Sequence, residues 1–162
     1  KDCDSSWAYY TGGFDRAGGI GFAGDVRAAS TDAHEAIWDG FSAFRCIRDL
    51  SPSDDSPSIG DLDMENQALL CSAQSQLTTA LDFGLAQVVR ARLEAQKSLE
   101  DVAADAGWAA LEILGPALDR AGNERDAAAY ASLQSFWSAG RPADEAAIDD
   151  AIASLDAVFG CP

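Results

Sequence analysis

The sequence predicts an all-α protein, an antiparallel helical bundle with two disulfides. Apolar residues recur every three or four positions in each long segment, and no segment shows the sustained alternation that is typical of strands. Four cysteines, an even number, stand far apart in the chain. With 162 residues, of which 48% are hydrophobic, the chain is long enough to bury one core, so we expect a single helical domain over residues 1–162.

The first helix is expected over residues 4–11, with Asp4 or Ser5 as its N-cap and with Trp7 and Tyr10 on one face. Six glycines in the following thirteen residues predict a loop. This loop is not expected to bind a nucleotide phosphate, because no hydrophobic strand precedes it.

The next helix is expected to begin at Ser30–Asp32, where Asp32 and Glu35 resemble a capping box, and to end near Cys46. A connection rich in proline, serine and aspartate follows at residues 51–60. The acids after it suggest a calcium loop beginning at Asp61, but Asn66 occupies the sixth position, where such a loop needs glycine. We therefore do not expect a calcium loop of this type.

Four further helices are expected, over residues 61–97, 98–115, 123–140 and 142–160. Pro116 should end or kink the second of these, because proline removes a backbone donor. Asn123 is the expected cap of the third. The 98–115 segment has an apolar stripe that is expected to face the core, made of Val102, Ala106, Ala109, Ile113 and Leu114.

The charge balance is strongly acidic, with 27 acidic and 11 basic side chains and a formal net charge of −16. Such a protein repels nucleic acid and anionic membranes. The charge suits a very soluble protein in a salty or extracellular medium, or one whose partner is a metal cation. No run of about eighteen apolar residues is present, so no membrane span is expected.

The cysteines form no CxxC pair, so a zinc ribbon or a thioredoxin-like motif is not expected. Three pairings into two disulfides are open, and we favour Cys46 with Cys71 and Cys3 with Cys161. Disulfides persist in oxidising compartments, so we expect a secreted, periplasmic or cell-surface protein. The chain starts without a signal peptide, and we interpret it as a mature form whose leader has been removed.

No catalytic residues are predicted. His34 is the one histidine, and no nucleophile motif accompanies it, so we do not expect an enzyme. His34 lies one turn before Ile37 and Trp38, on the face that should turn inward. It could simply hydrogen-bond at the helix start, or it could ligate a metal together with nearby carboxylates such as Glu35.

The chemistry of the available donors favours a hard cation. Carboxylates and a tyrosine phenolate suit Fe(III), with one imidazole tolerated, whereas zinc-type sites would need more histidine or thiolate ligands. Tyr10, His34, Glu35 and Glu65 are therefore candidate ligands, although Tyr10 is also spaced for packing in the core.

Several segments resemble the Fe-assimilating (low-iron-inducible periplasmic) protein family of algae, which includes the phytotransferrins. They are Asn66 and the runs DSSWAYYTGG (4–13), FRC (44–46), LLC (69–71), AGWAALEILGPAL (106–118) and AIASLDAVFGCP at the end. Together they cover most of one repeat of that family, in the same order. The resemblance implies extracytoplasmic iron binding or uptake.

By position, the resemblance carries Asp4, Tyr10, Arg45 and Asn66 into the site. Asp4 and Tyr10 would be metal ligands, and Arg45 would hold a bound anion or cap a helix. A cell-surface or receptor partner would then take part in uptake. The alternative is a secreted helical interaction module that binds no metal.

Overall fold

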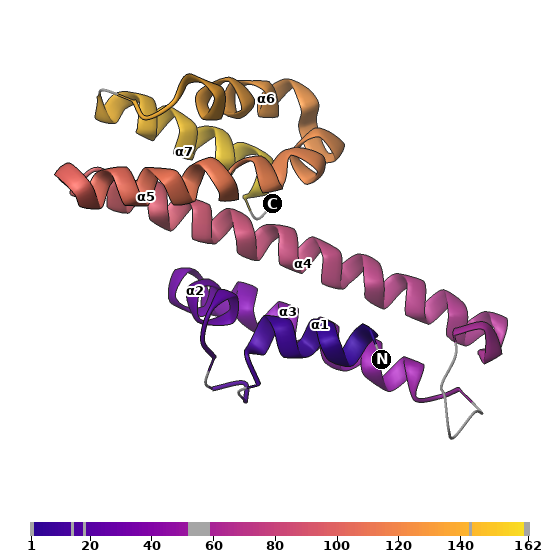
Figure 1. Cartoon of the computed structure of the whole chain (residues 1–162). Helices are drawn as coiled ribbons and strands as arrows, with labels where there is room; N and C mark the ends of the chain where they lie inside the picture. Colours follow the sequence, from indigo (N-terminus) through magenta and orange to yellow (C-terminus); the bar gives the residue numbers. More distant parts are fainter. Residues whose placement is uncertain (1, 14, 18, 52–58, 143, 161–162) are drawn as a thin grey trace. The chain divides into compact units, whose positions relative to one another are not determined.

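The computed structural model describes the backbone of residues 2–13, 15–17, 19–51, 59–142 and 144–160 (Figure 1). Every regular element in these ranges is helical, which confirms the predicted all-α class. In chain order the elements are α1 (Asp2–Thr11), α2 (Phe22–Ala29), α3 (Thr31–Arg48), η1 (Ile59–Asp61), α4 (Met64–Gln96), α5 (Asp101–Leu114), η2 (Pro116–Leu118), α6 (Asp119–Ala139) and α7 (Glu145–Phe159).

The packing divides the chain into two compact units, where the sequence predicted one core. Unit 1 is Lys1–Gly84 and unit 2 is Leu85–Pro162, so the boundary falls inside α4. Although α4 has 33 residues, no helix in the described ranges is both long and apolar enough to cross a membrane.

In unit 1, α1 packs against α2 and α3, and α3 runs antiparallel to the first part of α4. Helices α3 and α4 approach closely at Gly40. A Cβ on Gly40 would lie 3.1 Å from the Cβ of Leu77. The buried positions of α3 include Ala33, His34 and Ile37, and Ile37 lies four residues after Ala33 and three after His34, on the same face.

Unit 2 has a core of its own, formed by the end of α4 together with α5, α6 and α7. Its largest fully buried side chains include Leu93, Leu111, Tyr130, Leu133, Leu155 and Phe159. At the surface of the unit, Arg90 of α4 bonds Asp156 of α7 at 3.0 Å, and Lys97 pairs with Asp149.

Several helix starts differ from the predictions. Helix α1 begins at Asp2, so neither Asp4 nor Ser5 caps it. Helix α3 is capped by Ser30, whose side chain accepts from the Ala33 amide, rather than by Asp32. The glycines around α2 predicted a loop, whereas the structure has a helix there. Burial of Ala23 and Val26 stabilises this helix. Tertiary packing can override a weak helix propensity.

Helix α6 begins at Asp119, before the predicted start at Asn123, and it contains a break at Asp126. Asp126 has non-helical backbone angles, and its carboxylate accepts hydrogen bonds from the amides of Ala128 and Ala129. Asn123, the predicted cap, lies before the break and donates instead to the Asp119 carbonyl. Helix α5 does end just before Pro116, as predicted.

The predicted core stripe of α5 is wrong except at Leu114, which is partly buried and packs against the core. Ala104, Trp108 and Leu111 are the buried positions, whereas Val102 and Ile113 are exposed. Both faces of this helix are apolar, so periodicity alone did not identify the inner one.

The predicted Cys46–Cys71 disulfide is absent, because both cysteines are free and exposed. Cys46 lies five residues beyond buried Phe41, about 140° further round α3, and Cys71 lies about 100° round α4 from buried Leu70. Both cysteines therefore lie away from the buried faces of their helices. The predicted Cys3–Cys161 pair lies outside the described residues.

Candidate functional site

A chain of buried hydrogen bonds joins α1, α3 and the loop after α1. The Tyr10 hydroxyl lies 2.9 Å from Nδ1 of His34, and Nε2 of His34 lies 3.0 Å from the carbonyl oxygen of Arg16. Tyr10 is 4% exposed and His34 is 1% exposed. The predicted inward orientation of His34 is therefore confirmed.

These contacts define the tautomer of a neutral His34. A carbonyl oxygen only accepts, so Nε2 carries the hydrogen that is donated to Arg16. Nδ1 is then unprotonated and accepts a hydrogen bond from the Tyr10 hydroxyl. His34 thus presents a basic lone pair to a buried phenol.

The local sequence positions each of these groups. Helix α1 ends at Thr11 because Gly12 and Gly13 adopt positive φ, and the Thr11 hydroxyl bonds both the Trp7 carbonyl and the Gly13 amide. Before α2 begins, the loop places the Arg16 carbonyl beside His34 of α3. The residue after Arg16 is also held in place, because the Arg27 guanidinium of α2 donates to the Ala17 carbonyl.

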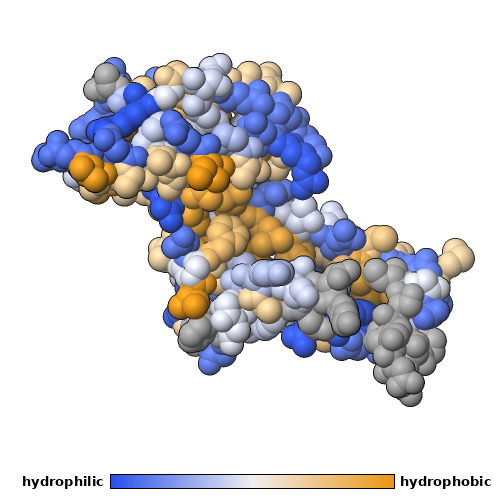
Figure 2. Space-filling view, in the orientation of Figure 1, coloured by the Kyte–Doolittle hydropathy of each residue, from blue (hydrophilic) through white to orange (hydrophobic). Residues whose placement is uncertain are grey.

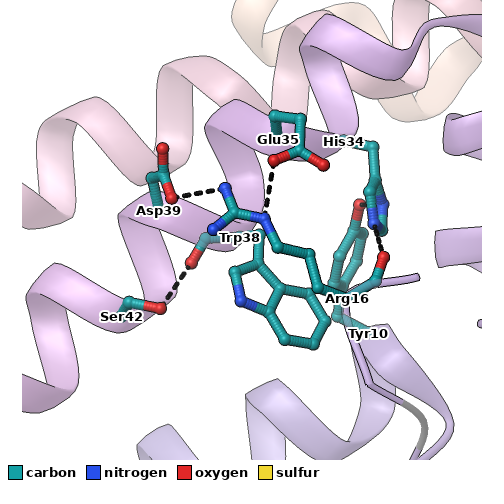
Figure 3. A network of polar contacts seen from close by, with 7 residues as sticks. All are labelled: Tyr10, Arg16, His34, Glu35, Trp38, Asp39 and Ser42. Atoms are coloured by element: carbon teal, nitrogen blue, oxygen red, sulfur yellow. Dashed lines mark hydrogen bonds and ion pairs between the residues drawn. The ribbon is translucent and has the colours of Figure 1, made fainter. Parts of the chain in front are cut away.

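Arg16 forms the outer edge of the cluster (Figure 3). Its Nε donates to Glu35 at 2.6 Å and its Nη2 donates to Asp39 at 2.5 Å, and both acids lie one turn apart on α3. Asp39 and Glu35 accordingly raise the pKa of the guanidinium. All three side chains are partly exposed, so this edge is open to solvent.

Aromatic rings surround the buried part of the cluster. Tyr10 stacks against His34 with ring centroids 5.9 Å apart, and it also contacts Phe22 and Phe41. Trp38 lies 6.0 Å from the His34 ring. Few water molecules can reach the Tyr10 hydroxyl in such surroundings, and burial, followed by the nearby charge of Glu35, raises its pKa.

The structure brings together three of the predicted metal residues, namely Tyr10, His34 and Glu35. Glu65 lies in the first turn of α4 with its side chain exposed. The side chain of Asp4 lies outside the described residues.

Two residues that were carried over from the resemblance have local roles. The Arg45 guanidinium lies over the Trp7 ring, 5.3 Å from its centroid, which is a cation–π contact. Asn66 donates to Asp63 through its backbone amide and through its side chain, at the start of α4.

Arg16 was missed from the sequence. It stands in a glycine-rich loop with no periodic pattern, and only its proximity to acids on α3 in the folded chain shows its role. Within the ranges that the structure describes, no group of three or more His, Cys, Asp or Glu side chains is arranged to hold a metal ion.

Comparisons with protein-family models, with curated proteins and with solved structures found no match to this chain.

Proposed function

We propose that this protein binds ferric iron outside the cytoplasm and captures it for uptake, without catalysing a reaction. The observation that supports the proposal is the hydrogen bond between Tyr10 and His34, which are 24 residues apart in the chain. The charge of Glu35 acts on the same tyrosine hydroxyl. Phenolate and carboxylate oxygens suit a hard trivalent cation.

In this proposal, Arg16 competes with the iron ion for the carboxylates of Glu35 and Asp39. Its single positive charge neutralises Glu35 and Asp39 when no metal is bound. Iron would replace the guanidinium at these two carboxylates, which are partly exposed and belong to surface ion pairs of low stability. The exposed edge formed by Arg16 is therefore the entrance to the site.

His34 serves as a proton acceptor in this proposal, which changes the role expected from the sequence. Both of its ring nitrogens already have hydrogen-bond partners. When Tyr10 loses its proton, the O–H bond breaks and an N–H bond forms at Nδ1 of His34. The phenolate lone pair then becomes available to the metal, and the new imidazolium stays paired with the phenolate.

The direct test is a titration with ferric nitrilotriacetate, which keeps Fe(III) soluble. Coordination by a phenolate gives a visible charge-transfer band, so the loaded protein should be coloured. Tyr10→Phe should abolish the band while the helix content stays unchanged. Tyr9→Phe is the matched control, because Tyr9 is the neighbouring residue and is 86% exposed, and it should keep the band.

Two results would overturn the proposal. One is a wild-type protein that takes no iron from the chelate, and the other is a Tyr10→Phe variant that keeps both the band and the affinity.

The second candidate is the interaction module without metal. It is favoured by the hydrogen bonds of the cluster, since Tyr10, both nitrogens of His34 and the Arg16 guanidinium all have partners in the metal-free chain. Under that function the cluster only joins α1 to α3, and the titration gives no colour with any variant.

The proposed location, secreted, periplasmic or at the cell surface, rests on the resemblance to exported iron-assimilating proteins and on the acidic composition. A bound anion near Arg45 and a receptor at the cell surface belong to the same proposal. Of the two predicted disulfides, Cys3–Cys161 is the one that remains a prediction.

A further inference from the structure

Helix α5 in unit 2 has an apolar stripe on its outer face. Val102 is 81% exposed and Ile113 is 73% exposed, and Ala106 and Ala109 between them are exposed as well. Positions i, i+4, i+7 and i+11 form one line along a helix. Figure 2 shows hydrophobic surface along α5 between hydrophilic areas.

This stripe is additional to the core-facing side of the helix. Ala104, Trp108 and Leu111 are the residues of α5 that are buried in unit 2. A surface helix normally has polar residues opposite its buried face, so a second apolar face needs a separate explanation.

Acidic side chains border one edge of the stripe. Asp101, Asp105 and Glu112 are all exposed, and α5 contains no lysine or arginine. Asp105 pairs with Arg141 at 2.7 Å but keeps a side chain that is 75% exposed. Glu112 accepts a hydrogen bond from the Trp108 indole.

We propose that the α5 stripe binds an amphipathic helix of a partner protein, whose own apolar stripe has lysine or arginine along one edge. The acidic edge of α5 would attract such a helix and orient it. Ala106 and Ala109 allow close approach at the centre, and Val102 and Ile113 contact the partner at both ends. These ends are eleven residues apart, or about 16 Å, so the partner helix needs about three turns.

A second copy of this chain is a poorer occupant of the stripe. Each chain has a net charge of −16, so pairing two α5 helices would bring two acidic chains together. The inference does not depend on iron binding, because it concerns α5 alone.

The test uses two synthetic helical peptides of four turns with leucine at i, i+4, i+7 and i+11. One peptide has lysine along one edge of its stripe, and the other has glutamate at the same positions. Binding is measured by fluorescence anisotropy of the labelled peptides. We expect the lysine peptide to bind and the glutamate peptide not to bind.

Attraction of any basic peptide to an acidic protein must be separated from binding to the stripe. V102S/I113S should weaken binding by about tenfold or more, because it removes both large apolar contacts. M64S is the matched control, since Met64 is also 86% exposed but lies in α4, and it should bind like the wild type. Circular dichroism should show unchanged helix content in both variants.

Equal binding by V102S/I113S and the wild type would overturn the proposal, since the attraction would then be electrostatic only. Absence of binding by the lysine peptide would also overturn it. A wild type that sediments as a dimer, and a V102S/I113S variant that sediments as a monomer, would show that a second copy covers the stripe instead.

Discussion

Unit 1 and unit 2 each contain one buried tyrosine, and the two hydroxyls donate to different kinds of acceptor. Tyr10 donates to the neutral imidazole of His34 at 2.9 Å. Tyr130 donates to the Asp119 carboxylate at 3.1 Å and to the Gly115 carbonyl at 3.3 Å. Burial is the main cause that raises the pKa of both, with Glu35 adding to it for Tyr10 and Asp119 for Tyr130.

The two hydrogen-bond acceptors differ in the charge they would carry once the phenol proton is lost. A phenolate at Tyr130 would lie beside the negative charge of Asp119, and a carboxylate is a weak base. Tyr10 faces a ring nitrogen that becomes a cation when it accepts the proton, so charge separation is compensated locally. We therefore place the proposed iron site at Tyr10 rather than at Tyr130.

The rings are also packed differently. Tyr10 lies among Phe22, His34 and Phe41, whereas the Tyr130 ring lies directly on Gly122 and near Phe159. Aromatic contacts of the first kind have preferred geometries but tolerate small shifts. The Tyr130 ring leaves no room for a side chain on the glycine beneath it. A Cβ on Gly122 would lie 2.3 Å from Cδ2 of Tyr130, which is closer than real Cβ contacts.

The largest effect is expected for Gly122→Ala in unit 2. The added methyl group must displace a fully buried ring, and overpacking of this kind costs about 3 kcal/mol of unfolding free energy. Urea denaturation followed by circular dichroism measures the loss. A variant as stable as the wild type would show that the Tyr130 ring is free to move.

The next largest effect is expected for His34→Leu in unit 1. It leaves the buried Tyr10 hydroxyl and the Arg16 carbonyl without a partner, which costs about 2–3 kcal/mol. Adding Tyr10→Phe should recover part of this loss, because the unpaired hydroxyl is then removed as well. Denaturation of the single and double variants measures the coupling between the two residues. If the two losses of unfolding free energy simply add, the hydrogen bond between Tyr10 and His34 is contradicted.

A smaller effect is expected from alkaline pH. The folded chain holds Tyr10 and Tyr130 protonated above the usual tyrosine pKa of about 10, while the unfolded chain releases these protons. The folded state then binds more protons, so stability is intact below pH 10 and falls above it, by up to about 1.4 kcal/mol per pH unit for each residue.

Denaturation midpoints between pH 8 and pH 11.5 test this pH dependence. Tyr10→Phe and Tyr130→Phe should each flatten the decline, and the double variant should flatten it further. Equal slopes in all four proteins would mean that neither hydroxyl is held protonated.

The smallest effect on stability is expected for Arg16→Gln. Its ion pairs with Glu35 and Asp39 are partly exposed, and such pairs add little to stability, so the melting temperature should stay close to that of the wild type. Iron binding should become tighter, because the competing cation is gone. A large drop in melting temperature, or weaker iron binding, would contradict the role given to Arg16.

Residue patterns alone were enough to predict the helical class and several of the helix ends. Apolar periodicity identified α3 through α7, and Pro116 and Gly140 ended helices where backbone chemistry requires it. It also indicated that His34 faces inward, because the ring lies one turn before Ile37. These features depend on neighbours in the chain, which a sequence contains.

Contacts between distant residues were decided by the tertiary structure. Arg16 reaches acids that are 19 and 23 residues away, and no local pattern encodes that approach. Helix α2 forms among glycines because packing buries Val26, and α5 buries Trp108 rather than Val102 although both faces are apolar. Periodicity indicates that a face is apolar; only the packing of the other helices decides which apolar face is buried.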